Sequence, residues 1–179
     1  MSSKNKVFIA TSLDGYIADK QGGISWLDDI PDLGNEDMGY AAMMASTDAL
    51  IMGRNSFETV LSFDIDWPYD KAVFVLSNTL KSIPPALADR VFLEKGPLKE
   101  VLKRLHSQGF KELYIDGGKT IQNFLREDLI EEMIITTIPV LLGAGIPLFG
   151  LLDKPLKFKC VESKIYAGEI LQSRFLRKK

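Results

Sequence analysis

The chain has 179 residues, a net charge of −2 and a composition of 46% hydrophobic and 26% charged residues. This length fits one domain, residues 1–179, that buries its own hydrophobic core. Positive and negative residues are interspersed, and there is no basic run. We therefore predict that the protein binds neither nucleic acid nor a membrane surface. The single cysteine, Cys160, excludes an intrachain disulfide and makes a thiolate metal cluster implausible, and we predict no metal site.

The first apolar run, Val7–Ala10, follows six mostly polar residues. It is too short for the core of a signal peptide, and no segment approaches the roughly 20 apolar residues that span a bilayer. We therefore expect a cytoplasmic protein whose first strand lies at this run.

Strand and helix patterns alternate through the middle of the chain. The clearest helix runs from Pro97, which suits a first helical turn, to Gly109, which suits a C-terminal cap. Strands are predicted at 49–52, 72–76, 91–93, 113–115 and 133–138, and further helices near 54–61 and at 119–126. This alternation favours a largely parallel sheet with helices on its faces.

The C-terminal part has a different character. Residues 157–166 and 169–176 flank Ala167-Gly168, which predicts a hairpin of antiparallel strands at one side of the sheet. In the N-terminal third, residues 28–39 form the longest irregular stretch, either an active-site loop or a surface connection.

One strand-to-helix junction reads Met52-Gly53-Arg54-Asn55-Ser56. A glycine that ends a buried strand allows a close approach to a ligand, and the following helix offers free N–H groups to an anion. Arg54 adds a planar, permanently charged group that suits phosphate. Alone, the junction is equally consistent with a structural turn.

A second junction, Asp116-Gly117-Gly118-Lys119-Thr120, again places glycines between a strand and a helix. A nucleoside-triphosphate P-loop is rejected because position 113 is leucine, and the Rossmann fingerprint is rejected because the third glycine is missing. Two such junctions in one small α/β chain favour a phosphate-bearing ligand held across the strand ends.

Five segments, taken together, resemble one family: 10–18, 52–58, 75–78, 116–118 and 139–149. They are similar to the dihydrofolate-reductase-like superfamily, especially the reductase domain of the bacterial bifunctional riboflavin-biosynthesis deaminase-reductase and its stand-alone relatives. The resemblance implies a three-layer α/β fold with a mostly parallel central sheet and a C-terminal antiparallel hairpin. It also implies NADPH as cofactor.

The resemblance can be carried over by position. Residues 53–56 match the motif that grips the cofactor phosphates, with Arg54 at the 2′-phosphate, and 77–78 match the strand end beside the adenosine ribose. Residues 117–120 match the turn under the pyrophosphate and nicotinamide. The implied cofactor-binding residues are Ala10, Ile17, Gly53, Arg54, Asn55, Ser56, Ser77, Asn78, Gly117, Gly118, Lys119 and Thr120. Relatives carry a cis peptide bond in the glycine turn, and we predict one within 116–118.

The candidate catalytic residues are three aspartates. Counting back from Gly53, Asp37 matches the carboxylate that dihydrofolate reductases place on the preceding helix. There it would be buried with a raised pKa, or it would merely favour the start of a helix. Asp14 borders the family's active site but also suits turn chemistry. Asp116 stands where the riboflavin reductases usually have glutamate.

The substrate is less defined than the cofactor. Tyr16 replaces a basic residue of the riboflavin reductase pattern, and the zinc deaminase motif is absent. Trp26 would either hold a substrate ring or close a surface over the core. We predict hydride transfer from NADPH to a pterin- or ribityl-pyrimidine-like heterocycle in a homodimeric protein. The alternatives are an NADPH-binding protein without turnover and a purely structural module.

Overall fold

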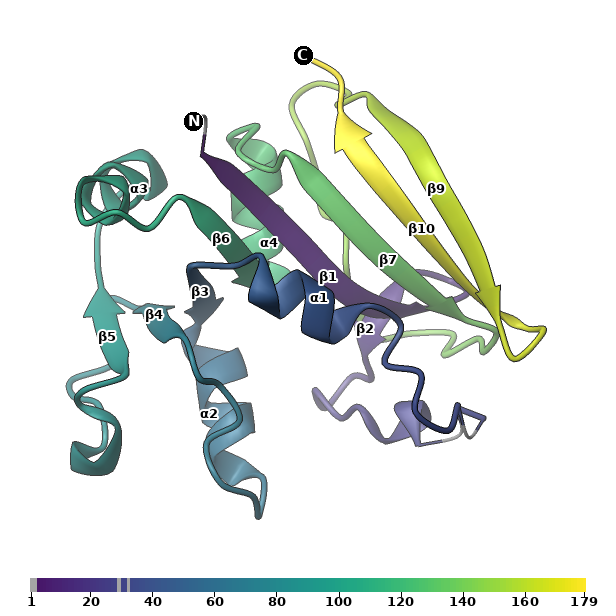
Figure 1. Cartoon of the computed structure of the whole chain (residues 1–179), viewed down its shortest axis with the longest axis horizontal. Helices are drawn as coiled ribbons and strands as arrows, with labels where there is room; N and C mark the ends of the chain where they lie inside the picture. Colours follow the sequence, from purple (N-terminus) through teal and green to yellow (C-terminus); the bar gives the residue numbers. More distant parts are fainter. Residues whose placement is uncertain (1–2, 29, 32) are drawn as a thin grey trace.

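The computed structural model describes residues 3–28, 30–31 and 33–179, and within them eight strands form one sheet in the order β5-β4-β3-β6-β1-β7-β10-β9 (Figure 1). Neighbouring strands from β5 to β7 are parallel, whereas β10 and β9 are antiparallel to what precedes them. The strands are β1 Lys4–Ser12, β3 Ala49–Gly53, β4 Ala72–Leu76, β5 Val91–Glu94, β6 Glu112–Asp116, β7 Glu132–Ile138, β9 Phe158–Tyr166 and β10 Ile170–Arg177.

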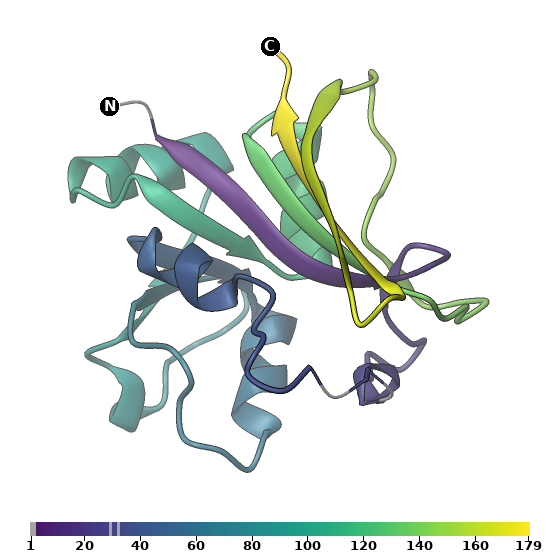
Figure 2. The same ribbon diagram turned by 45° about the vertical axis from the view of Figure 1, so that its right-hand side comes forward.

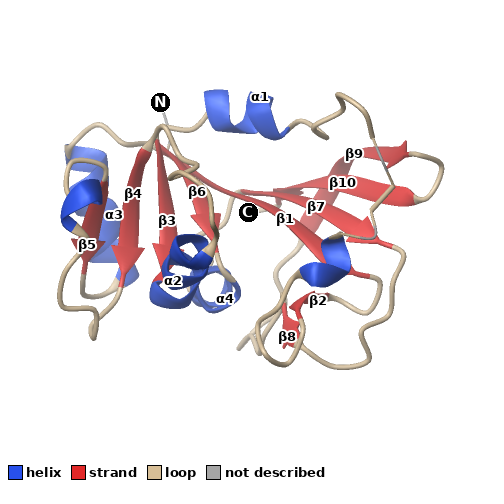
Figure 3. Ribbon diagram, turned by 90° about the horizontal axis from the view of Figure 1, so that it is seen from below, coloured by secondary structure: helices blue, strands red, loops and turns tan. Residues whose placement is uncertain are grey.

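Helices cover both faces of the sheet and give three layers (Figure 3). Met43 of α1 and Phe57 of α2 pack on one face, and Leu105 of α3 and Phe124 of α4 pack on the other. The helices are α1 Tyr40–Ala45, α2 Arg54–Ser62, α3 Leu98–Ser107 and α4 Gly118–Arg126, with short 3-10 turns η1 Ser25–Leu27 and η2 Pro85–Leu87. The buried strand β3 is apolar on both sides, as its continuous apolar run predicts.

The predicted strands, helices and C-terminal hairpin are confirmed, with small differences at their ends. The first strand is the main exception, because it extends from Lys4 to Ser12 rather than over 7–10. Two of its polar residues, Asn5 and Lys6, are buried with partners: Asn5 Nδ2 donates to the Leu129 carbonyl at 2.7 Å, and the Lys6 ammonium pairs with the Glu112 carboxylate at 2.7 Å. The predicted three-layer α/β architecture, with a mostly parallel sheet and a C-terminal antiparallel hairpin, is therefore confirmed.

The strand β1 pairs with β6 near its amino end and with β7 over the rest of its length. It pairs with β6 only as far as Lys6 and Tyr114, but it pairs with β7 from Lys6 to Ser12. The sheet consequently opens between β1 and β6 toward their carboxyl ends (Figure 3). The Tyr114 hydroxyl donates a 2.9 Å hydrogen bond to the Phe8 carbonyl at the start of this opening.

A second, small sheet was not predicted. The strand β2, Tyr16–Ala18, pairs with β8, Ile146–Pro147, so that segments far apart in sequence lie together. Gly145 permits this contact, because a Cβ there would collide with the Ala18 carbonyl oxygen.

The β9–β10 hairpin forms the outer edge of the large sheet, joined by a tight turn at Ala167 and Gly168 (Figure 2). None of the helices among the described residues combines the length and the hydropathy needed to cross a lipid bilayer.

Candidate functional site

The carboxyl ends of the adjacent strands β3 and β6 carry two uncapped helix starts. The helix α2 begins after Gly53 and α4 after Gly117, and neither N-cap residue provides a side-chain hydrogen bond. The N–H groups of a first helical turn have no partner within the helix, and they carry partial positive charge. Two such turns at one sheet edge form a surface suited to a diphosphate. We call residues 53–56, 77–79 and 117–120 the phosphate edge.

The two glycine turns of the phosphate edge interlock. A Cβ at Gly53 would lie 2.9 Å from Thr120 Oγ1, and one at Gly117 would collide with Ser56 Oγ. Gly117 adopts φ 88° and ψ 134°, which non-glycine residues rarely adopt. Thr120 is buried beneath the turn, whereas Asn55 and Lys119 are exposed beside it.

The predicted cis peptide bond is wrong. Every peptide bond from Asp116 to Gly118 is trans. The turn is made by the unusual torsion angles of Gly117, so no change at the peptide bond itself is needed to redirect the chain.

Arg54 reaches from α2 toward the turn after β4. Its Nη1 donates to Thr79 Oγ1 at 3.2 Å, and its Nε lies 3.7 Å from Glu58 Oε1. Ser77 Oγ shapes the turn by accepting a hydrogen bond from the Leu80 N–H at 2.9 Å. The guanidinium is exposed between helix and turn, where it can bind a phosphate. The sequence reasoning missed Thr79, although it directly follows the predicted Ser77 and Asn78.

A cavity of about 400 Å³ continues the phosphate edge beyond Ser77 and Asn78. The end of β5, the start of α3 and the end of α4 line it, and its size lies within the range of small-ligand sites. The sequence signal that could have indicated this place is Gly96-Pro97 at the start of a helix. Its lining includes Glu94, Gly96, Pro97, Asn123 and Arg126.

The small sheet covers the start of α4. A Cβ at Gly118 would lie 2.7 Å from Ile17 Cδ1 and 3.4 Å from Ile146 Cγ2, so both side chains rest on this glycine. Ala10 lies half-buried on β1, beyond the point where β1 leaves β6. Of the two predicted nicotinamide contacts, Ile17 meets Ile146 at the start of α4, whereas Ala10 packs in the cluster that contains Trp26.

Trp26 is buried against Ile138 and Ile170, and its Nε1 has no hydrogen-bond partner among the described residues. This packing agrees with a side chain that closes a surface over the core. The described part of the 28–39 stretch packs on the same cluster and accepts a hydrogen bond from Gln172 at the Met38 carbonyl. Positions 29 and 32 of that stretch lie outside the described residues.

Asp14 links two loops. Its carboxylate accepts hydrogen bonds from Ser12 Oγ at 2.6 Å, from the Leu142 N–H at 3.1 Å and from the Gly143 N–H at 2.8 Å. The bond from Ser12, followed by those from the two backbone N–H groups, holds the pKa of Asp14 below its usual value. Asp14 therefore stabilises its own turn, as the sequence predicts. It also joins the segment before β2 to the segment before β8.

The expectation of a raised pKa at Asp37 is wrong. The side chain is exposed just before α1, where it accepts hydrogen bonds from the N–H groups of Ala41 at 2.7 Å and Gly39 at 2.8 Å. These bonds lower the pKa of Asp37 because they stabilise its ionised form. Its geometry is that of a residue that favours a helix start, which was the alternative interpretation.

Asp116 is the aspartate that the structure places beside the phosphate edge, directly before Gly117 at the end of β6. Burial raises its pKa, although hydrogen bonds from the Gly117 N–H and the Tyr114 side chain oppose this shift. Tyr40, Tyr69 and Tyr114, which we call the tyrosine cluster, have pKa values raised by burial and by the charge of Asp116. Sequence reasoning missed this cluster.

Comparison with known proteins agrees with this geometry. The chain is 35% identical over 181 residues to the uncharacterized protein YwjB of Bacillus subtilis strain 168, and the match covers 99% of each. It is 54% identical, with a TM-score of 0.95, to a Shewanella sp. PV-4 protein for which a role in riboflavin biosynthesis has been proposed. That match covers 98% of this chain and 99% of the other.

The fold is also that of dihydrofolate reductase from Enterococcus faecalis, a structure solved in complex with NADP(H) and RAB-propyl. The TM-score is 0.66 at 16% identity, over 98% of this chain and 97% of that one. The model of the RibD C-terminal domain matches residues 6–171. The chain therefore belongs to the RibD C-terminal domain family.

Proposed function

We propose that this protein is an NADPH-dependent reductase that transfers a hydride to a planar, nitrogen-rich heterocycle of pterin or ribityl-pyrimidine type. Membership of the RibD C-terminal domain family gives it a reductase-type function. The observation that carries the cofactor assignment is the pair of uncapped helix starts at Gly53 and Gly117, with Arg54 beside them.

The residues of the phosphate edge fit a dinucleotide phosphate. Backbone N–H groups after Gly53 and Gly117 would hold the pyrophosphate, because the missing Cβ atoms keep both turns close together. Arg54 and Thr79 would hold the 2′-phosphate, which distinguishes NADPH from NADH. The cavity beyond Asn78 would receive the adenosine end.

The chemical step needs a hydride, a proton and a site without bulk water. Bound NADPH would supply the hydride to an electrophilic carbon of the substrate, a C=N carbon of a pterin ring or the ribosyl carbon attached to the amino group of a pyrimidine. Ile17 and Ile146 would exclude water at Gly118, and the hydrogen bonds of Asp14 would keep their segments in place. Asp116 would hold a proton for the neighbouring substrate nitrogen, because burial favours its neutral form.

The test combines binding and turnover. Calorimetry should give NADPH binding to the wild-type protein, and absorbance at the reduced nicotinamide band should fall when a pterin or a ribosylamino-pyrimidine is added. Binding without oxidation across the panel would instead favour the alternative of a nucleotide-binding protein without turnover. If NADPH did not bind at all, both assignments would be wrong.

We also propose that the protein forms a homodimer through its β9–β10 hairpin. The edge strand β9 is exposed along nearly all of its length and carries the apolar side chains of Val161 and Ile165, the latter 68% exposed. Exposed apolar edges of sheets favour association with another chain. Light scattering should give twice the monomer mass, and Ile165→Lys should return the protein to a monomer, whereas a monomeric wild-type protein would contradict the proposal.

A further inference from the structure

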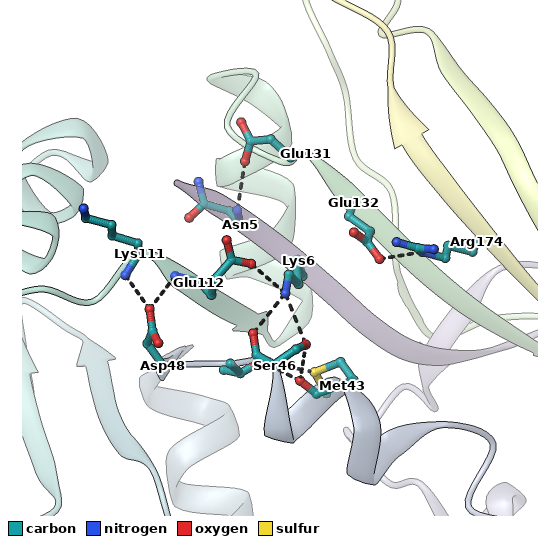
Figure 4. A network of polar contacts seen from close by, with 11 residues as sticks. Asn5, Lys6, Met43, Ser46, Asp48, Lys111, Glu112, Glu131, Glu132 and Arg174 are labelled. Atoms are coloured by element: carbon teal, nitrogen blue, oxygen red, sulfur yellow. Dashed lines mark hydrogen bonds and ion pairs between the residues drawn. The ribbon is translucent and has the colours of Figure 1, made fainter. Parts of the chain in front are cut away.

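Three basic side chains on the sheet face that carries Asp116, those of Lys6, Arg174 and Lys164, pair with carboxylates away from it. Lys6 Nζ binds Glu112 Oε2 at 2.7 Å and the Ser46 carbonyl at 3.0 Å, near the amino ends of the strands (Figure 4). Glu112 and Asp116 are separated along β6 by about 13 Å, at roughly 3.3 Å per residue. The cation of Lys6 is thus already paired at the opposite end of this face.

Arg174 shows the same arrangement on β10. Its Nε donates to Glu132 Oε1 at 2.7 Å (Figure 4). In the strand register Arg174 lies opposite Ile134, so it reaches back by two residues toward the amino end of β7 to meet Glu132. Lys164 of β9, which lies opposite Gln172, is on this face as well and pairs with Glu162 Oε1 at 3.0 Å, two residues back along its own strand. These three basic side chains are therefore held by carboxylates on the side away from the phosphate edge.

The surroundings of Asp116 contain negative charge and hydroxyl groups. The charge of Asp70 acts on Tyr40, and the charge of Asp116 acts on Tyr40, Tyr69 and Tyr114. No basic side chain forms an ion pair with Asp116 in the described part of the chain, which includes every lysine, arginine and histidine. The tyrosine rings are packed by neighbours, Phe8 against Tyr40 at 5.8 Å and Trp67 against Tyr69 at 5.2 Å between centroids.

We propose that the substrate is an unphosphorylated, uncharged heterocycle that turns its N–H groups toward Asp116 and the tyrosine cluster. This inference rests on the proposed reductase function and adds the substrate's charge to it. An anion that leaves water for a site without a cation loses its hydration without compensation, so a phosphate beside Asp116 is disfavoured. The carboxyl oxygens of Asp116 instead accept hydrogen bonds from ring N–H and amino groups.

The direct experiment compares two ribosylamino-pyrimidines that differ only in a terminal phosphate, and a pterin with and without a carboxylate tail. NADPH oxidation and calorimetric binding are measured for each compound with the wild-type protein. We expect kcat/KM and affinity to be higher by about tenfold or more for the uncharged member of at least one pair. Equal or better use of both charged members, or binding of none of the four compounds, would overturn the inference.

A charge introduced into the tyrosine cluster gives a second test. Tyr40→Lys places an ammonium group beside Phe8 and Asp116, and we expect it to raise the relative kcat/KM of the phosphorylated compound by several-fold. The matched control is Ala42→Lys, which adds the same charge at an exposed position of the same helix. A preference unchanged by Tyr40→Lys, or changed equally by Ala42→Lys, contradicts the inference.

Failure of this inference differs from failure of the proposed function. A protein that binds and oxidises NADPH but prefers the phosphorylated compound remains a reductase with another substrate class. A protein that does not bind NADPH overturns the proposed function, and this inference with it.

Discussion

The phosphate edge and the tyrosine cluster meet at the Asp116–Gly117 peptide, yet their chemistry is opposite. On one side, uncapped backbone N–H groups and Arg54 attract negative charge. On the other, Asp116 and three tyrosine hydroxyls offer hydrogen-bonding oxygens without a paired cation. In the proposed function this difference would orient the ligands, because phosphates and N–H-rich rings would be directed to different ends of one site.

The largest effect is expected at the point where the two regions join. Gly117→Ala forces a Cβ into Ser56 Oγ and into a backbone region of positive φ, so we expect a loss of about 2–4 kcal/mol in the free energy of unfolding. Urea denaturation measures it. Gly168→Ala is the matched control, because its φ is also positive but its Cβ would meet open space. Equal losses in the two variants would mean that the close contact with Ser56 does not contribute to the free energy of unfolding lost in Gly117→Ala.

Asp116→Asn tests whether Asp116 is the proton donor. Burial raises the pKa of Asp116 above its usual value of 3.8, so the carboxyl group keeps its proton to a higher pH than an exposed aspartate does. As the pH rises further, the group loses this proton. We expect the wild-type kcat to fall along that limb, and the variant to lose the limb and about a hundredfold in kcat. The affinity for NADPH should stay the same. An unchanged pH profile of kcat would exclude Asp116 as the proton donor.

Asp14→Asn tests the link between the loops that cover the start of α4. The Leu142 and Gly143 N–H groups donate to different oxygens of the Asp14 carboxylate. Asparagine has only one side-chain oxygen, so these two hydrogen bonds cannot both persist. We expect kcat to fall several-fold with little change in the KM for NADPH. Because the pKa of Asp14 is lowered in the fold, its ionised form stabilises the protein above about pH 4 and this contribution disappears as the pH falls. The wild-type protein should therefore lose more stability toward acid pH than the variant does.

The smallest effect is expected at Asp37. Asn retains a side-chain oxygen for the start of α1, so Asp37→Asn should keep kcat/KM within about twofold and leave the unfolding temperature close to that of the wild type. Steady-state kinetics and thermal unfolding measure both. A tenfold fall in kcat would restore Asp37 as a catalytic candidate and weaken the assignment to Asp116.

The phosphate edge was largely predictable because each of its parts is contiguous in the sequence. A buried strand, a glycine and a helix start follow one another at Gly53 and at Gly117, and parallel strands bring such junctions to the same edge. The torsion of Gly117 was not predictable, because glycine is compatible with both a cis peptide and an unusual φ and ψ.

The other side of the site could not be predicted in the same way. Tyr40, Tyr69 and Tyr114 come from a helix, a loop and a strand, and no spacing relates them. Asp37 was placed on a helix by an ungapped count, but α1 begins only at Tyr40. The pairing of β2 with β8 depends on a close backbone contact at Gly145 that is invisible in local patterns.

The central claim is that the phosphate edge binds NADPH, and the ratio of two affinities tests it most directly. Calorimetry with NADPH and NADH should show a preference for NADPH that falls by about tenfold to a hundredfold in Arg54→Ala. Arg90→Ala, which removes an exposed arginine paired with Asp89, is the control and should leave the ratio unchanged. An Arg54→Ala protein with the wild-type ratio of the two affinities would contradict the account.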